Sequence, residues 1–221
     1  MKLNPMLFFV LALLGLWVCG CVYMIFFERR KESLRLRLVA KLGACLMLVG
    51  SLAFFGQCAV KVGGLVFLGP SFEWPVGWAT GVVRDSQGRY IVPVHFANRI
   101  QVYDPDGKFL HGWWIDGSSY DFALRIAKEN AVEAYVARND QRLLYSPEGR
   151  LLERTGISPN VYNQVYAENT FSKYFPTPWI LWPLTNPFYA LAVAGIGFAL
   201  RFILDRRNPA RNTGLPMLRS R

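Results

Sequence analysis

The feature that most constrains this chain is the position of three long apolar runs near its two ends. Met6 to Phe27 holds twenty-two residues without a charge, and a helix needs about 20 residues to cross the hydrocarbon core of a bilayer. A second run extends from Leu38 to about Val60 and contains Lys41, and a third extends from Asn186 to about Leu204. The runs predict three transmembrane helices.

An apolar run at the start of a chain is compatible with two kinds of processing. A signal peptide is disfavoured because the run exceeds the usual apolar length of about 7–15 residues and basic residues follow it instead of a cleavage site. The string from Val18 to Cys21 faintly resembles a lipoprotein processing site, but six further apolar residues follow it. We therefore predict that this run is retained without a lipid.

The excess of positive charge lies beside the apolar runs and not in the segment between them. The formal net charge is +10, yet residues 71–178 hold eleven basic and twelve acidic residues. Residues 28–41 hold six basic and two acidic residues, and the tail from Arg201 holds six basic and one acidic residue. Cytoplasmic segments beside transmembrane helices are enriched in Lys and Arg. We therefore expect a multi-pass plasma (inner) membrane protein with its N-terminus outside, its C-terminus cytoplasmic and no nucleic-acid partner.

These patterns divide the chain into four parts. The predicted parts are a first transmembrane helix with a basic cytoplasmic loop (1–37), a second transmembrane helix with an exit segment (38–70), an extracytoplasmic β domain (71–178), and a third transmembrane helix with a basic cytoplasmic tail (179–221). Trp179 and Trp182 precede the third run, where an interfacial belt of aromatic residues is expected.

The segment between the runs contains an internal repeat with an offset of forty-two residues. Residues 89–110 read RYIVPVHFANRIQVYDPDGKFL, and residues 131–152 read AVEAYVARNDQRLLYSPEGRLL. The shared positions are Val94 and Val136, Tyr103 and Tyr145, Pro105 and Pro147, Gly107 and Gly149, and Leu110 and Leu152. Alternating apolar positions predict short strands, and a Pro-acid-Gly string is typical of the turn between two strands. With a further turn upstream, each copy is predicted to form four strands.

Residues 81–110 carry the most specific motif in this repeat. They read GVVRDSQGRYIVPVHFANRIQVYDPDGKFL, with an Asp-x-x-Gly turn and an Asp-Pro-Asp-Gly-Lys-Phe turn, and this string resembles an NHL repeat of β-propeller proteins. The resemblance covers about Trp78 to Gly156 and implies blade-like sheets. We therefore predict three transmembrane α-helices and an extracytoplasmic all-β domain of two propeller-blade-like four-stranded sheets.

Two blades cannot close a ring, because closed propellers generally use four to eight. The central ligand channel of the family is therefore not carried over to this chain. A stack of two sheets would expose apolar outer faces unless something covers them. Three covers remain open: the flanking segments Val62 to Phe72 and Val161 to Tyr174, a second copy of the chain, or a different subunit.

The residues that commonly carry chemistry all have structural interpretations here. His95 and His111 are the two histidines, and strand alternation predicts His95 at the surface. Asp104, Asp106 and Glu148 lie in turns that favour carboxylates, without the ligand spacing of a calcium loop. The four cysteines lie in the apolar runs. We expect no catalytic activity, no metal and no cofactor.

Five residues are predicted to form interaction surfaces. Trp113 and Trp114 are adjacent, so one is expected to face the core and the other a partner or a sugar. Within the apolar runs, Gly50, Ala194 and Gly195 would permit close helix approach. No carboxylate lies at mid-membrane depth, which argues against an ion carrier.

Three functions are consistent with this layout. The leading hypothesis is a non-catalytic accessory or scaffold subunit, whose partners are the lipid bilayer and other membrane-protein subunits or further copies of itself. The alternative is a membrane-anchored module that senses or binds a small ligand or glycan. A third hypothesis is an enzyme completed by self-association.

Overall fold

The computed structural model describes residues 5–27, 33–61, 69–115 and 121–206. It divides into two compact units: Met1–Phe54 together with Pro187–Arg221, and Phe55–Asn186. Three segments that the sequence predictions use lie outside the described residues. These are residues 28–32 of the basic loop, residues 62–68 of the first flanking segment, and the basic tail beyond residue 206.

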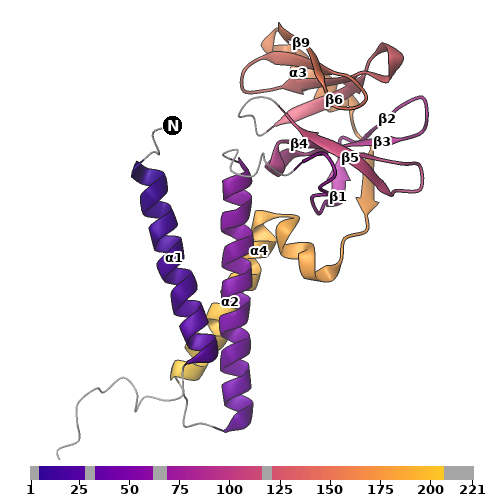
Figure 1. Cartoon of the computed structure of the whole chain (residues 1–221). Helices are drawn as coiled ribbons and strands as arrows, with labels where there is room; N and C mark the ends of the chain where they lie inside the picture. The colour runs from indigo at the N-terminus through magenta and orange to yellow at the C-terminus, as the bar shows by residue number, and fades with distance from the viewer. Residues whose placement is uncertain (1–4, 28–32, 62–68, 116–120, 207–221) are drawn as a thin grey trace, which may run out of the picture. The chain divides into compact units, whose positions relative to one another are not determined.

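Three long helices correspond to the three apolar runs. They are α1 (Pro5–Phe26), α2 (Leu34–Lys61) and α4 (Pro187–Arg206) (Figure 1). Among the described residues, two stretches are long and apolar enough to cross a membrane, Leu34–Ala59 and Pro187–Arg206. In α1, the residues whose side chains the structure describes form a shorter apolar stretch, Gly15–Phe26. The transmembrane character of α1 and the membrane location therefore remain predictions.

Helices α2 and α4 approach each other through glycines. A Cβ atom added to Gly50 would lie 2.6 Å from the carbonyl oxygen of Ala190 and 2.9 Å from the Cα atom of Ala194. A Cβ atom added to Gly197 would lie 2.5 Å from the carbonyl oxygen of Gly43. Small residues permit this backbone-to-backbone packing between apolar helices.

The part of the chain that follows α2 and precedes α4 contains two four-stranded antiparallel sheets. The first sheet has the order β2 (Val83–Arg84), β3 (Tyr90–Val94), β4 (Arg99–Tyr103) and β5 (Phe109–Trp114). The second sheet has the order β6 (Phe122–Ile126), β7 (Val132–Val136), β8 (Gln141–Tyr145) and β9 (Leu151–Gly156). In both sheets the strands lie side by side in chain order. The prediction of an all-β domain with two four-stranded sheets is confirmed.

The forty-two-residue offset in the sequence is preserved in the strand pairing. Tyr103 pairs with Tyr90 in the first sheet, and Tyr145 pairs with Val132 in the second. A β-bulge interrupts the pairing of β4 with β5 directly before Tyr103. Another interrupts the pairing of β8 with β9 directly before Tyr145. Tyr103 and Tyr145 therefore occupy equivalent places in two successive sheets, as the repeat predicts.

The positions with left-handed backbone repeat with the same offset. Asn98 and Asp140 have φ values of 48° and 47°, and each lies between the second and third strands of its sheet. Gly107 and Gly149 have φ values of 86° and 88° in the Pro-acid-Gly turns. A positive φ favours glycine or asparagine, so the turn residues of the repeat reflect a shared backbone path.

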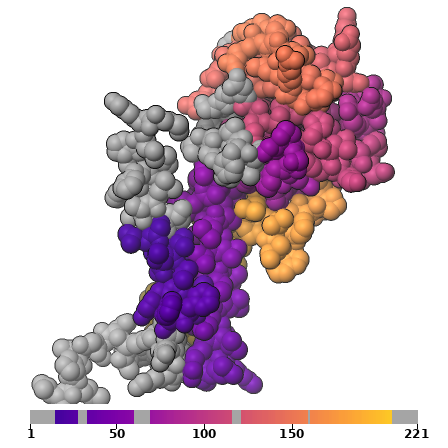
Figure 2. Space-filling view, viewed as in Figure 1, coloured from indigo at the N-terminus to yellow at the C-terminus, as the bar shows by residue number. Residues whose placement is uncertain are grey.

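Segments of the chain itself cover both outer faces of the two-sheet stack. A two-stranded sheet of β1 (Gly77–Thr80) and β10 (Ser172–Phe175) packs on the face of the first sheet that points away from the second. Helix α3 (Pro159–Glu168) packs on the far face of the second sheet through Val165. The layers therefore run from the β1–β10 sheet through the two four-stranded sheets to α3 (Figures 1 and 2). Of the predicted flanking segments, Val161 to Tyr174 supplies most of α3 and part of β10, whereas β1 lies outside both predicted segments. Most of the other segment, residues 62–68, lies outside the described residues.

The surface position predicted for His95 is wrong. His95 begins a short 3-10 turn, and its ring centroid lies 4.9 Å from that of Phe122 in the second sheet. Its Nδ1 atom is buried without a hydrogen-bond partner. The alternation rule failed because it assumes one solvated face, whereas the first sheet is covered on both faces.

Candidate functional site

A buried polar network attaches the segment before β1 to the first sheet. Gln101 of β4 is fully buried, and its Oε1 accepts a hydrogen bond of 2.5 Å from the backbone N–H of Trp74. Its Nε2 donates to the carbonyl oxygen of Trp74 at 3.0 Å and to the Tyr103 hydroxyl at 2.8 Å. The Tyr103 hydroxyl donates to Glu73 at 3.0 Å. The side-chain amide of Gln101 therefore hydrogen-bonds to the Trp74 backbone in the way that a neighbouring strand would.

Arg99 lies two residues before Gln101 on the same face and is also fully buried. Its Nη2 donates to the carbonyl oxygens of Phe72 at 2.7 Å and Gly69 at 3.2 Å, and its guanidinium lies 4.8 Å from the ring centroid of Trp114. Its Nε and Nη1 atoms have no hydrogen-bond partner. Burial lowers the pKa of Arg99 to about 10. The Arg99 guanidinium therefore binds the segment of the same chain that covers the first sheet.

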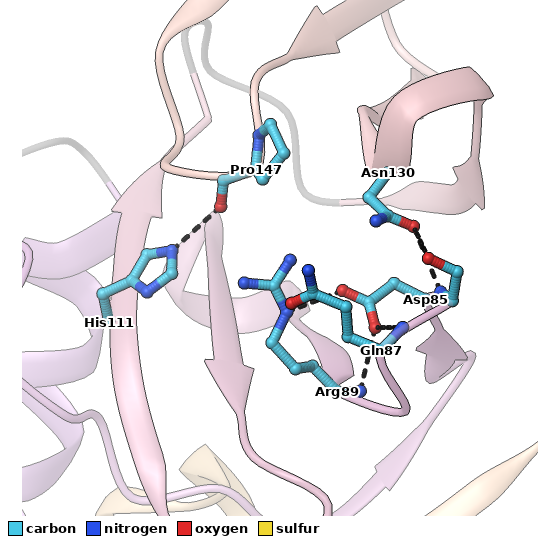
Figure 3. A network of polar contacts seen from close by, with 7 residues as sticks. Asp85, Gln87, Arg89, His111, Asn130 and Pro147 are labelled. Atoms are coloured by element: carbon cyan, nitrogen blue, oxygen red, sulfur yellow. Dashed lines mark hydrogen bonds and ion pairs between the residues drawn. The ribbon is translucent and has the colours of Figure 1, made fainter.

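The two sheets are joined by contacts between their turns (Figure 3). The Ser86 hydroxyl donates to Asn130 Oδ1 at 2.8 Å, and the Ser86 backbone N–H donates to the same atom at 3.1 Å. His111 Nε2 lies 3.0 Å from the carbonyl oxygen of Pro147. Trp113 is stacked beneath the same turn, because a Cβ atom added to Gly149 would lie 2.6 Å from its Cε3 atom. These contacts fix the second sheet on the first.

Four of the five predicted interaction residues make contacts within the chain. Trp113 is 7% exposed and belongs to the core between the two sheets. Trp114 is half-buried beneath Arg99, and Gly50 packs on Ala194. Gly195 differs, because a Cβ atom added there would meet nothing within 4 Å. Gly195 alone of the five therefore presents an open surface in the described part of the chain.

Sequence reasoning missed an exposed aromatic pair on the β1–β10 sheet. Trp78 and Tyr174 are cross-strand partners, their ring centroids lie 6.4 Å apart, and they are 68% and 46% exposed. Their strand neighbours Gly77, Ala79 and Phe175 are buried. The signal was the alternation of Trp78 with Gly77 and Ala79, which predicts one buried and one open face. We name Trp78 and Tyr174 the aromatic pair.

A second exposed aromatic group lies in η3, a 3-10 helix from Trp179 to Leu184. Trp179, Ile180 and Trp182 are 80%, 63% and 54% exposed. The Pro183 carbonyl oxygen of η3 accepts a hydrogen bond of 2.7 Å from the side chain of Gln57 near the end of α2. This group directly precedes α4 in the chain, where the aromatic belt is predicted.

Within the described residues, no group of three or more His, Cys, Asp or Glu side chains is placed to hold a metal ion. The turn carboxylates act locally: Asp104 Oδ1 accepts a hydrogen bond of 2.8 Å from the backbone N–H of Lys108. Asp85 likewise accepts from the backbone N–H groups of Gln87 and Arg89, both at 2.9 Å. These carboxylates stabilise the turns in which they lie.

Comparison with known proteins leaves the family open. No family model matches the chain, and no curated protein matches it. Among solved structures, a selenomethionine-substituted virginiamycin B lyase from Staphylococcus aureus is similar at 17% sequence identity and a TM-score of 0.33. The similarity covers 43% of this chain and 32% of that chain, so it spans about a third of the lyase. At this TM-score the likeness carries no argument about fold or activity.

The class of protein therefore rests on the strand pairing and the helices. The chain has an all-β domain of two blade-like four-stranded sheets and two helices that are long and apolar enough to cross a membrane. The assignment to NHL repeats remains a resemblance of sequence.

Proposed function

We propose that this chain is an accessory subunit of a membrane protein complex. Its three apolar helices cross the membrane, its amino terminus and β domain lie outside the cytoplasm, and its basic loop and tail lie inside. The charge asymmetry of the sequence supports this orientation, because Lys and Arg concentrate beside the predicted cytoplasmic helix ends. The lipid bilayer contacts the helices and the aromatic group of η3.

The proposal that the chain binds a partner protein rests on the aromatic pair. Exposed aromatic side chains on a rigid sheet are the residues that contribute most binding energy at protein interfaces. Trp78 and Tyr174 present their rings from paired strands, so little conformational entropy is lost when a partner covers them. The blade faces are already covered by the chain, so the aromatic pair replaces Trp113 and Trp114 as the proposed contact.

Extraction of the native membrane in mild detergent, followed by native mass measurement, tests this proposal. The full chain should be recovered in an assembly with a second protein, and Trp78→Ala with Tyr174→Ala should release it. The matched control replaces Leu110 and Leu152 by alanine, because these side chains are 44% and 55% exposed at equivalent positions of the two outer strands. Recovery of a monomer from wild-type membranes would contradict the proposal, as would an assembly that the aromatic double variant leaves intact.

A lipid contact is the main competitor for the aromatic pair. Nitroxide lipids in nanodiscs quench tryptophans that lie at the membrane interface. We expect the η3 tryptophans, Trp179 and Trp182, to be quenched and Trp78 to be spared, as read from single tryptophan-to-phenylalanine variants. Strong quenching of Trp78 would assign the pair to lipid and contradict its role in binding a partner.

A second function is favoured by a separate observation. A cavity of about 260 Å³ lies where β2 and β6 meet the end of α3, and its lining includes Arg84, Arg125 and Glu168. This cavity supports the alternative of a small-ligand binding module, and both functions can reside in one chain.

A further inference from the structure

The cavity combines an apolar floor with a polar border. Its aliphatic lining consists of Val83, Leu124, Ile126 and Val165. The polar residues of the lining are Arg84 of β2, Arg125 of β6, and Glu168 and Asn169 at the end of α3. Ligand sites commonly pair an apolar surface with a few polar groups that fix the orientation of the ligand.

The walls of the cavity are held together by Asn169, which follows α3. Its Nδ2 donates hydrogen bonds to the carbonyl oxygens of Gly81 at 3.1 Å and Leu124 at 2.8 Å. One side chain therefore joins the approach to β2, the middle of β6 and the end of α3. A cavity fixed in this way loses little entropy when a ligand enters.

The two arginines at the border differ in their partners. Arg125 forms an ion pair of 2.6 Å with Glu168 of α3. Arg84 has no carboxylate partner among the described side chains. Its Nη2 donates to the Tyr90 hydroxyl, and its guanidinium lies 4.6 Å from the centroid of that ring.

A second cation lies on the same tyrosine. Lys173 of β10 places its Nζ atom 4.1 Å from the centroid of the Tyr90 ring. Hydrogen bonds from Lys173 and Arg84 lower the pKa of Tyr90. The nearby Arg89 is already paired with Asp85 at 2.7 Å, and the part of the chain that the structure describes gives Lys173 no carboxylate partner. Two like charges thus converge on one phenol, and no carboxylate of the described residues pairs with either of them.

Cation–π stacking on Tyr90 explains part of this arrangement, but it leaves most N–H donors of Arg84 without an acceptor in the Tyr90 side chain. A guanidinium has five N–H donors, and one phenol oxygen and one ring face use a small share of them. Charge-assisted hydrogen bonds to a carboxylate or phosphate use the guanidinium fork in full and are about twice as strong as neutral ones. An anion beside Arg84 would also reduce the repulsion between Arg84 and Lys173.

We propose that this cavity binds a small organic anion, with its oxyanion group on Arg84 and its apolar part on the aliphatic floor. The proposal deepens the second function and is independent of the partner contact through the aromatic pair. The predicted ligand class is a carboxylate or phosphate that carries a short aliphatic or aromatic group, since the volume of about 260 Å³ is small for a larger molecule.

Binding of benzoate to the full chain in nanodiscs tests the proposal, with empty nanodiscs as the blank and benzyl alcohol as the neutral isostere. Saturation-transfer NMR titrations should show that benzoate binds and that benzyl alcohol binds about tenfold more weakly or less. Arg84→Gln should weaken the binding of benzoate by about tenfold or more. Arg150→Gln, at an exposed turn of the second sheet, should leave it unchanged.

A second variant separates loss of the site from loss of the fold. Ile126→Phe keeps Arg84 and fills part of the cavity with a larger side chain, so it should abolish benzoate binding while the near-ultraviolet circular dichroism stays native. The proposal is overturned if wild-type protein fails to bind benzoate at about 10 mM, or if Arg84→Gln binds it as well as wild type does. Native mass measurement of Arg84→Gln should still show the partner, so failure of this site and failure of the accessory function are distinguishable.

Discussion

The side-chain amide of Gln101 hydrogen-bonds to both the N–H and the C=O of Trp74. The equivalent position in the second sheet is Leu143, which packs in the core between the sheets. The two copies therefore differ where their neighbours differ. The second sheet packs on the first, whereas the first meets an irregular segment whose backbone groups need partners.

Replacing this amide should destabilise the β domain. Gln101→Leu leaves the N–H and C=O of the buried Trp74 without their partners, and we expect the free energy of unfolding to fall by about 2–4 kcal/mol. Urea unfolding of the full chain in detergent, followed by tryptophan fluorescence, measures the change. The control Gln141→Leu alters a half-buried glutamine of β8 and should change stability little. Equal stability of the two variants would contradict the strand-like role of Gln101.

Two glycines at equivalent turns give a matched pair of variants. Gly107→Ala adds a methyl group with nothing within 4 Å at a φ of 86°, so it should cost about 1 kcal/mol from backbone strain. Gly149→Ala has the same strain at a φ of 88°, but its methyl group would lie 2.6 Å from Trp113 Cε3. We expect a further loss of about 1–3 kcal/mol from overpacking. Thermal unfolding of both variants checks this difference, and equal melting temperatures would refute the contact between the turn and Trp113.

The repeat made these turns predictable, but it did not predict the contact. Pro105 and Pro147, with their following acidic residues and glycines, indicate two equivalent turns because turn geometry is a local property of the chain. The packing of Gly149 on Trp113 joins residues thirty-six positions apart, and neither copy signals it alone. The same limit applies to Gln101, which looks like a solvated strand residue until the segment at Trp74 is placed over it.

Helix packing offers a third test. Gly50→Leu should separate α2 from α4, because even a Cβ atom would lie 2.6 Å from the carbonyl oxygen of Ala190. Gly195→Leu should leave this pair intact, since it has nothing within 4 Å. Spin labels on the two helices should report a longer distance in Gly50→Leu only. Identical distances in wild type and both variants would contradict the glycine-mediated contact.

The Gly195 variant also addresses the partner. Because Gly195 presents an open surface, Gly195→Leu should weaken association with a partner helix without changing the chain's own fold. Native mass measurement after mild extraction would show this as a loss of the second protein. A complex that withstands Gly195→Leu would remove this face of α4 from the proposed interface.

The stability of the β domain should depend on pH through His95. Burial lowers the pKa of His95 below its ordinary value of 6.5, and the Asp121 carboxylate opposes this in part. Below about pH 6.5 the unfolded chain therefore binds a proton before the folded chain does, so stability should fall as pH drops through this range. His95→Gln should flatten this dependence. An unchanged pH profile in His95→Gln would show that His95 does not contribute.

His95 also shows why strand alternation was insufficient. Val92 and Val94 lie on the apolar face as expected, but the opposite face of the same strand also became buried against the second sheet. Burial of both faces depends on how sheets stack, which the pattern of one strand does not contain. The aromatic pair was missed for the same reason, because Trp78 lies on a strand whose partner β10 is ninety or more residues away.

The orientation of the β domain across the membrane is the central claim, and thiol labelling in intact cells tests it most directly. In a chain whose four cysteines are replaced, Lys108→Cys places a thiol at an exposed turn of the first sheet, and Ser33→Cys places one at the exposed start of α2. A membrane-impermeant maleimide should label Lys108→Cys in intact cells and Ser33→Cys only after permeabilisation. Labelling of both in intact cells, or of both only after permeabilisation, would place the domain and the loop on one side and contradict the account.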